Sequence, residues 1–146
     1  MKAPFLVFSI VVLSLFSSCG SNKELQERAP AQLNQAYYSE TEDGLALHIP
    51  VATIQENRVA LKSVYFRGLH SDLKQSAEQS NIYTAHFATG KGERVMHVDP
   101  KEEYGNRAPQ KPEKSPFEIK ENEAILVFEQ AGKTKYYKIT GIVEKE

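Results

Sequence analysis

The chain has 146 residues, with 18 Lys and Arg against 19 Asp and Glu and a formal net charge of −1. A chain of this length fits one folded domain that buries a sizeable core without a metal or disulfides. The balanced charge excludes the basic footprint of a nucleic-acid-binding protein, so no nucleic-acid partner is expected.

The N-terminus has the layout of a cleaved secretory signal peptide, which we place at residues 1–18. After one Lys, an apolar run that ends at Phe16 is shorter than the about 20 residues of a membrane-spanning helix. Two small serines follow, and then the single cysteine, Cys19. A lone cysteine in an exported protein is a free thiol, pairs with another chain or carries a lipid, and this position favours the lipid. The alternative is an ordinary signal cut near Ser18, with an incidental cysteine.

The four residues Phe-Ser-Ser-Cys at 16–19 resemble the lipobox of bacterial lipoproteins. In that family a diacylglyceryl group is attached to the cysteine thiol, the signal is cut just before it, and the new amino terminus is usually acylated. The resemblance implies that Cys19 is the lipid-attachment residue. The sequence departs from the family pattern at Phe16, where Leu is usual.

The next segment, residues 19–44, is polar and has no clear period, so we expect the lipidated cysteine and a flexible tether there. Tyr37 and Tyr38 are expected to be the first residues that dock on the domain. From residue 45 strand signals dominate. The run LALHIPVATI at 45–54 contains Pro50, which is expected at a sheet edge or a bend.

Further along the chain, NRVALKSVYFRG at 57–68 reads as a strand that ends on Gly68. Residues 69–81 fit either one or two helical turns capped by Ser71 or a polar loop. Residues 82–98 predict two strands around the turn TGKG, and 99–116, with four prolines, predict a long surface excursion.

The clearest pattern is a hairpin at the C-terminal end. Strands at 123–129 and 134–143 flank Gln130–Lys133, and one of Tyr136 and Tyr137 should face inward. We therefore predict an all-β domain over 45–146. It would be a single small antiparallel β-sandwich or open barrel with a C-terminal β-hairpin and at most one short helix.

One histidine pair is a weak candidate for a metal site. If an even-numbered loop is centred on Lys91–Gly92, His86 opposes His97 and Thr84 opposes Asp99 on one face of the hairpin. Opposed residues are close enough for two imidazoles to share a metal. A three-residue loop would put the histidines on opposite faces, and an ordinary solvated face explains the same residues without a metal.

Two other groups of residues contain chemically active side chains. His70-Ser71-Asp72 has the residue types of nucleophilic catalysis, but sequence neighbours seldom have that geometry, and a cap or loop explains them. The acidic residues Asp99, Glu102 and Glu103 match no calcium loop and fit a solvated loop. No catalytic residue and no cofactor are therefore assigned.

Several motifs together resemble a group of small lipoproteins of Gram-negative bacteria. They are the lipobox-like start, SVYFRG at 63–68, DPKEEYGNRAP at 99–109 and ENEAILVFEQAGKTKYYKI at 121–139. That group has no known activity, so the resemblance implies only export and a lipid anchor. Gly20, where an inner-membrane retention signal would have Asp, indicates the outer membrane, with the domain facing the periplasm or the surface.

Two hypotheses follow for the function. The first is a non-enzymatic binding or accessory module of the cell envelope, with an envelope protein or a glycan as its partner. The alternative is a metal-dependent or hydrolytic enzyme that uses His86, His97 and Asp99.

Overall fold

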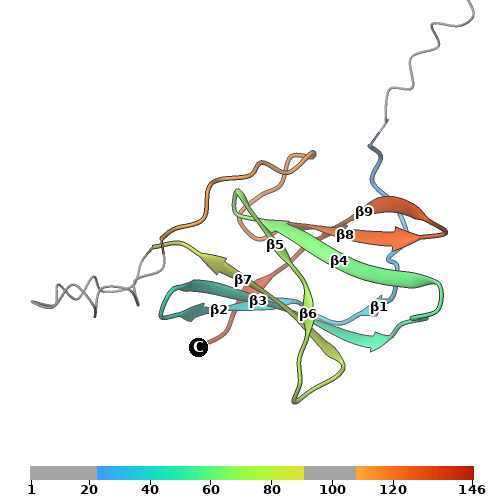
Figure 1. Ribbon diagram of the computed structural model, residues 1–146, viewed down its shortest axis with the longest axis horizontal. Helices are drawn as coiled ribbons and strands as arrows, with labels where there is room; N and C mark the ends of the chain where they lie inside the picture. The colour runs from blue at the N-terminus through green and yellow to red at the C-terminus, as the bar shows by residue number, and fades with distance from the viewer. Residues whose placement is uncertain (1–22, 91–107) are drawn as a thin grey trace, which may run out of the picture.

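The computed structural model describes residues 23–90 and 108–146, which form ten β-strands and no helix (Figure 1). The strands are β1 (Gln32–Leu33), β2 (Tyr37–Thr41), β3 (Gly44–Thr53), β4 (Val59–Phe66), β5 (Leu69–Asp72), β6 (Lys74–Gln75), β7 (Ile82–Ala88), β8 (Ala124–Gln130), β9 (Lys133–Ile139) and β10 (Val143–Glu144). The predicted signal peptide, Cys19 and the predicted strand at 93–98 lie outside the described residues.

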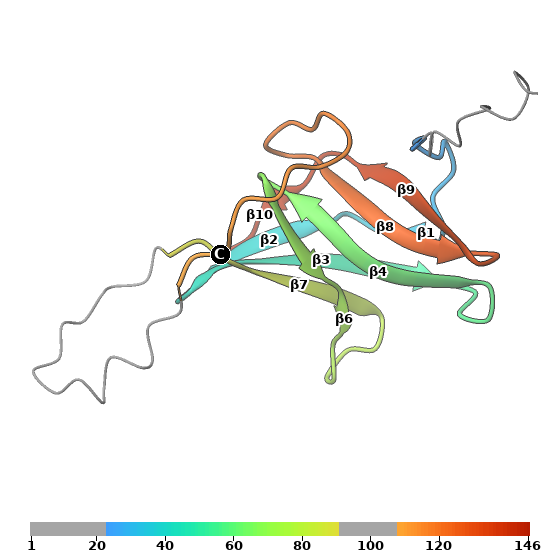
Figure 2. The ribbon, with the colours of Figure 1, turned by 45° about the horizontal axis from the view of Figure 1, so that its top comes forward.

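The strands form two sheets that pack face to face, which confirms the predicted β-sandwich (Figure 2). Sheet 1 has the order β10-β2-β3-β7-β6, with β1 also paired to β3, and sheet 2 has the order β5-β4-β8-β9. All strand pairs are antiparallel except β10 with β2. The chain passes from sheet 2 to sheet 1 at Leu73, between β5 and β6, where the Leu73 amide donates to the Lys62 carbonyl.

The core lies between the inner faces of the two sheets. Sheet 1 contributes alternate residues of β3 and β7, and sheet 2 contributes alternate residues of β4 and β8, as expected of pleated strands with one face inward. The large side chains of this core cluster that are fully buried include Leu47, Ile49, Phe66, Phe87 and Leu126.

Strand β8 is buried on its outer face as well. Ile125 and Val127 point away from the central core, yet they are 0% and 9% exposed. Their partners across β9 are Lys138 and Tyr136, and the segment around Phe117 packs on these, with the Phe117 ring 5.4 Å from that of Tyr136. Tyr137 packs on the central core instead, so the prediction that only one of the two tyrosines faces inward is confirmed.

Two tight hairpins form the outer strand pairs of sheet 2, β4 with β5 and β8 with β9. Ala131 and Gly132 both have positive φ, at 52° and 71°, as a two-residue type I′ turn requires. The predicted C-terminal hairpin is therefore confirmed, although β9 ends at Ile139 instead of 143. Arg67 and Gly68, at φ 49° and 75°, form a second turn of the same kind between β4 and β5.

This second hairpin explains why the predicted helical turns do not form and why the predicted polar loop is found only at residues 76–81. The chain turns back at Gly68, and β5 pairs with β4 along residues 69–72. The backbone of residues 69–72 therefore forms strand hydrogen bonds and is not available for a helix. The Ser71 hydroxyl, predicted to cap a helix, donates to the His86 carbonyl instead.

The domain also begins earlier than the predicted boundary at residue 45. Strands β1 and β2 belong to sheet 1, where Ala36 and Tyr38 are buried, so Tyr38 does dock as expected. Before them, Leu25 bridges to Tyr136 on β9, and the Gln26 amide donates to the Tyr136 carbonyl. A flexible tether over the whole of 19–44 is therefore wrong, because Leu25, Gln26 and strands β1 and β2 all contact the sandwich.

Pro50 lies inside β3, a strand with neighbours on both sides, and not on an outer edge strand. The Val51 amide donates to Asn81 on the β7 side, so the Pro50 nitrogen, one residue earlier, faces the β1–β2 side. There β2 has ended and β1 has not begun, and Pro50 offers its carbonyl to the Asn34 amide. The missing N–H therefore falls in the gap between β2 and β1, where no strand residue is paired with Pro50 on that side.

A polar cluster ties the two sheets together at one end. The Arg67 guanidinium donates to the Tyr38 hydroxyl at 3.0 Å and lies 4.4 Å from the centre of its ring. The Tyr38 hydroxyl in turn donates to the Glu144 carboxylate at 3.0 Å, and Arg67 Nε donates to the Glu121 carbonyl. One buried tyrosine thus joins the β4–β5 turn, β2 and the C-terminal strand.

Replacing Tyr38 by Phe tests this cluster, because it removes one hydroxyl and keeps the buried ring. We expect Tyr38→Phe to lower the free energy of unfolding by about 1–3 kcal/mol, since both lost partners are charged groups. Tyr37→Phe is the matched control and should change stability by less than about 0.5 kcal/mol. Urea denaturation followed by circular dichroism measures both, and equal effects of the two variants would contradict the role of the Tyr38 hydroxyl.

Candidate functional site

The outer face of sheet 1 carries a group of polar side chains, which we call the His48 face: Tyr37, Ser39, His48, Thr84, His86 and Lys145. Because β3 alternates, the strand that buries Leu47 and Ile49 in the core points His48 outward. Strand pairing places five of these side chains, together with Lys74 and Ala46, in two rows across the sheet. The first row is Lys74, Thr84, His48 and Tyr37, and the second is His86, Ala46 and Ser39.

His48 is held in place by both of its ring nitrogens. Nε2 lies 3.3 Å from the Ser39 hydroxyl on β2, and Nδ1 lies 3.0 Å from the Thr84 hydroxyl on β7. The Tyr37 ring stacks on the imidazole at a centroid distance of 4.8 Å. Three neighbours on two strands therefore fix the ring orientation of a half-buried histidine.

The electrostatic surroundings of His48 favour its neutral form. Burial lowers its pKa below the ordinary value of 6.5, and the nearby His86 and Lys145 lower it further by repelling a second positive charge. Lys145, just beyond β10, places its ammonium 4.2 Å from the centre of the Tyr37 ring. The charged or protonatable groups that act on His48 are thus basic.

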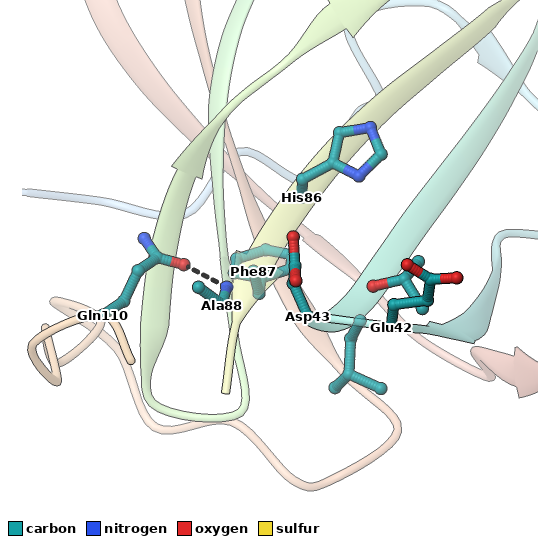
Figure 3. A pocket seen from close by; sticks show the side chains of 8 residues that line it. Glu42, Asp43, His86, Phe87, Ala88 and Gln110 are labelled. Carbon is teal, nitrogen blue, oxygen red and sulfur yellow. Dashed lines mark hydrogen bonds between the residues drawn. The ribbon is translucent and has the colours of Figure 1, made fainter. Parts of the chain in front are cut away.

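An open pocket of about 390 Å³ adjoins this face at the ends of the strands (Figure 3). Figure 3 shows Glu42 and Asp43, in the turn between β2 and β3, on one side and Gln110 on the other. Gln110 is anchored because its side-chain oxygen accepts from the Ala88 amide, and its side-chain nitrogen donates to the His70 carbonyl. The pocket is therefore lined by the acidic Glu42 and Asp43 and by His86, which lies at the end of the His48 face.

The predicted metal site is described only in part. Thr84 and His86 do share one face of β7, as predicted, whereas His97 and Asp99 lie outside the described residues. The Ala88 amide and carbonyl, which face the edge of β7 opposite β3, both bond to Gln110. The predicted even-numbered loop would also pair Ala88 with residue 95, and both backbone groups that such a pairing would use are bonded to Gln110. Within residues 23–90 and 108–146, no three His, Cys, Asp or Glu side chains are grouped as metal ligands.

The other sequence candidates do not assemble into a catalytic group. His70, Ser71 and Asp72 lie on β5, so Ser71 points to the opposite face from its two neighbours. The His70 ring contacts Tyr65, and its Nδ1 lies 3.4 Å from the Glu113 carboxylate. Asp99, Glu102 and Glu103 lie outside the described residues. The described part of the predicted excursion, residues 108–116, does run over the surface without regular structure.

Sequence reasoning missed His48, Ser39 and Lys145 as parts of a site. One sequence pattern could have indicated His48: in LALHIPV at 45–51, the histidine takes an outward position between aliphatic residues that are buried. The partners of His48 could not be inferred in the same way, because they come from other strands.

The pH dependence of stability tests the environment of His48. The unfolded chain binds a proton at this histidine more readily than the fold does, so stability should fall as pH drops from about 6.5 through the lower pKa of the folded state. His48→Gln should flatten this part of the profile, whereas His86→Gln, which keeps His48 buried, should largely preserve it. Imidazole NMR that finds a His48 midpoint at or above 6.5 would contradict this account.

No protein-family model, curated protein sequence or solved structure matches the chain. Within the two described ranges, no helix is long and apolar enough to cross a membrane.

Proposed function

We propose that the protein is a non-enzymatic binding or accessory module, anchored by lipid on Cys19 in the outer membrane, that meets its partner through the His48 face. One observation carries the binding part of this proposal. The polar groups of the face are spread over cross-strand rows of an open sheet and do not converge in a closed cleft. An open face suits contact with a large partner, whereas catalysis generally needs convergent groups in a concave site that excludes water.

The bond pattern at β7 also favours a binding module over the alternative enzyme. A metal site on His86, His97 and Asp99 depends on a strand paired beside β7. Along that edge, the His86 carbonyl accepts from Ser71, and both backbone groups of Ala88 bond to Gln110. These bonds at His86 and Ala88 compete with the strand pairing that would bring the three ligands together.

The lipid anchor is proposed from the lipobox-like sequence, and the fold is compatible with it. Leu25, the residue that bridges to β9, follows Cys19 by six positions, which is a reach of at most about 20 Å. This attachment point belongs to sheet 2, whereas the His48 face is the outer surface of sheet 1. Two or more acyl chains give stable anchoring, and the anchored domain would keep its binding face accessible.

The anchor is tested by labelling cells with an alkyne fatty acid. The full chain should be labelled and should sediment with membranes, whereas Cys19→Ala should lose the label, because no other thiol is present. Ser21→Ala, just after the lipobox-like segment, is the control and should remain labelled. Equal labelling of wild type and Cys19→Ala would exclude the anchor.

The binding face is tested by photo-cross-linking in intact cells. A p-benzoylphenylalanine residue in place of His86 should give a discrete cross-linked product, because this side chain is exposed on the His48 face. The same residue in place of Lys133, exposed in the β8–β9 hairpin, is the matched control and should give none. Immunoblotting detects the products, and adducts from position 133 alone would place the partner elsewhere.

A further inference from the structure

The two hydroxyls beside His48 change their hydrogen-bonding capacity with its protonation. A neutral imidazole has one donor and one acceptor nitrogen, so one of Ser39 and Thr84 must donate to it and the other must accept from it. A protonated imidazole donates from both nitrogens. Both hydroxyl protons are then available for another acceptor, and they lie next to a positive charge.

The charged or protonatable side chains that act on His48 or stand opposite Thr84 are basic, and positive charge attracts an anion. Lys145, beyond β10, and His86, on β7, act on His48 electrostatically, and Lys74 on β6 stands directly opposite Thr84 in the sheet. In the part of the chain that the structure describes, the acidic side chains next to this face are Glu42 and Asp43, which line the pocket that adjoins His86. They lie at the strand ends, whereas the basic groups surround the central row.

The aromatic residue of the face is already engaged within the protein. Tyr37 on β2 stacks on His48, which belongs to β3, and contacts the Lys145 ammonium, which follows β10. Strands β3 and β10 flank β2 on opposite sides, so the Tyr37 ring lies between its two partners. It therefore lacks the free flat surface on which a neutral sugar ring would stack.

We propose that the His48 face binds a tetrahedral oxyanion, a phosphate or sulfate group, through the hydroxyls of Ser39 and Thr84, with charge supplied by His48 and Lys145. This inference rests on the proposed binding function and names the chemical class of the group that the face recognises. A hydroxyl group donates its O–H to such an anionic oxygen, and charge-assisted hydrogen bonds of this kind are roughly twice as strong as neutral ones.

Binding should depend on pH in a defined direction. Protonation of His48 adds a charge and releases a second hydroxyl donor, so affinity should rise as pH falls. By linkage, the bound anion should raise the pKa of His48, which is lowered in the free protein by burial and by its basic neighbours. Within residues 23–90 and 108–146, the other titratable groups on or beside this face are Tyr37, His86, Lys145, Lys74, Glu42 and Asp43, and a single-site variant separates His48 from them.

The test follows the His48 imidazole by NMR in the full chain, purified in nonionic detergent, during titration with sodium sulfate against sodium chloride at equal ionic strength. Sulfate keeps the same charge between pH 5.5 and 7.5, so a change in affinity reports on the protein. We expect saturable binding that is at least about threefold tighter at the lower pH. Lys145→Gln should weaken binding by about threefold, and Thr84→Val should weaken it as well, whereas Lys133→Gln should not.

His48→Gln is the decisive variant, because it keeps a hydrogen-bonding side chain and removes the titration. It should retain weak sulfate binding but lose the pH dependence. A parallel titration with dihexanoyl phosphatidylglycerol distinguishes a lipid headgroup from a free or glycan-linked anion. Saturable binding of either probe at the His48 resonance supports the proposal. It is overturned if neither probe binds saturably or if His48→Gln keeps the full pH dependence.

These outcomes are independent of the anchor. Loss of sulfate binding with intact fatty-acid labelling would remove the oxyanion site and leave the membrane-anchored module standing. Sulfate binding by a chain whose Cys19 is unlabelled would leave the site standing and remove the proposed location.

Discussion

The alternation of side chains along β3 is the constraint on which the rest of the structure depends. This strand lies in the middle of sheet 1, and it presents Leu47 and Ile49 to the core and His48 to the outer face. A slip of one residue would exchange the two sets, so burial of the aliphatic residues also determines where the histidine points. Gly44 allows the close approach to β7 at the start of the strand, because a Cβ there would lie 2.0 Å from the Phe87 carbonyl oxygen.

Long-range contacts then close the sandwich around this strand. Residues 69–75 leave one sheet and join the other at Leu73, and the N-terminal segment covers part of the free edge of β9 at Tyr136. Tyr38 and Glu144, separated by 106 residues, meet through a hydrogen bond that brings β10 beside β2. The same pairing carries Lys145 to the outer face, so the interaction that closes the fold also supplies a charge to the candidate site.

The candidate site is therefore a product of the sheet as a whole. Ser39 comes from β2, His48 from β3, Thr84 from β7 and Lys145 from the end of the chain. On a rigid sheet these groups keep their spacing without a ligand, which lowers the ordering cost of binding. The proposed anion site lies on a different sheet from the one that Leu25 joins, and such a site would suit a module that recognises a charged group.

The amino-acid pattern alone determined the all-β class, the C-terminal hairpin and the shared face of Thr84 and His86, because period-two alternation and turn residues are local properties. It also carries the lipobox-like signal at Cys19, which stays a prediction. Only the tertiary structure decided that Arg67–Gly68 is a hairpin turn, that β1 and β2 belong to the sandwich, and that His48 has Ser39 and Thr84 as partners. Strand neighbours are set by long-range burial and pairing, and a linear sequence does not show which strands will lie side by side.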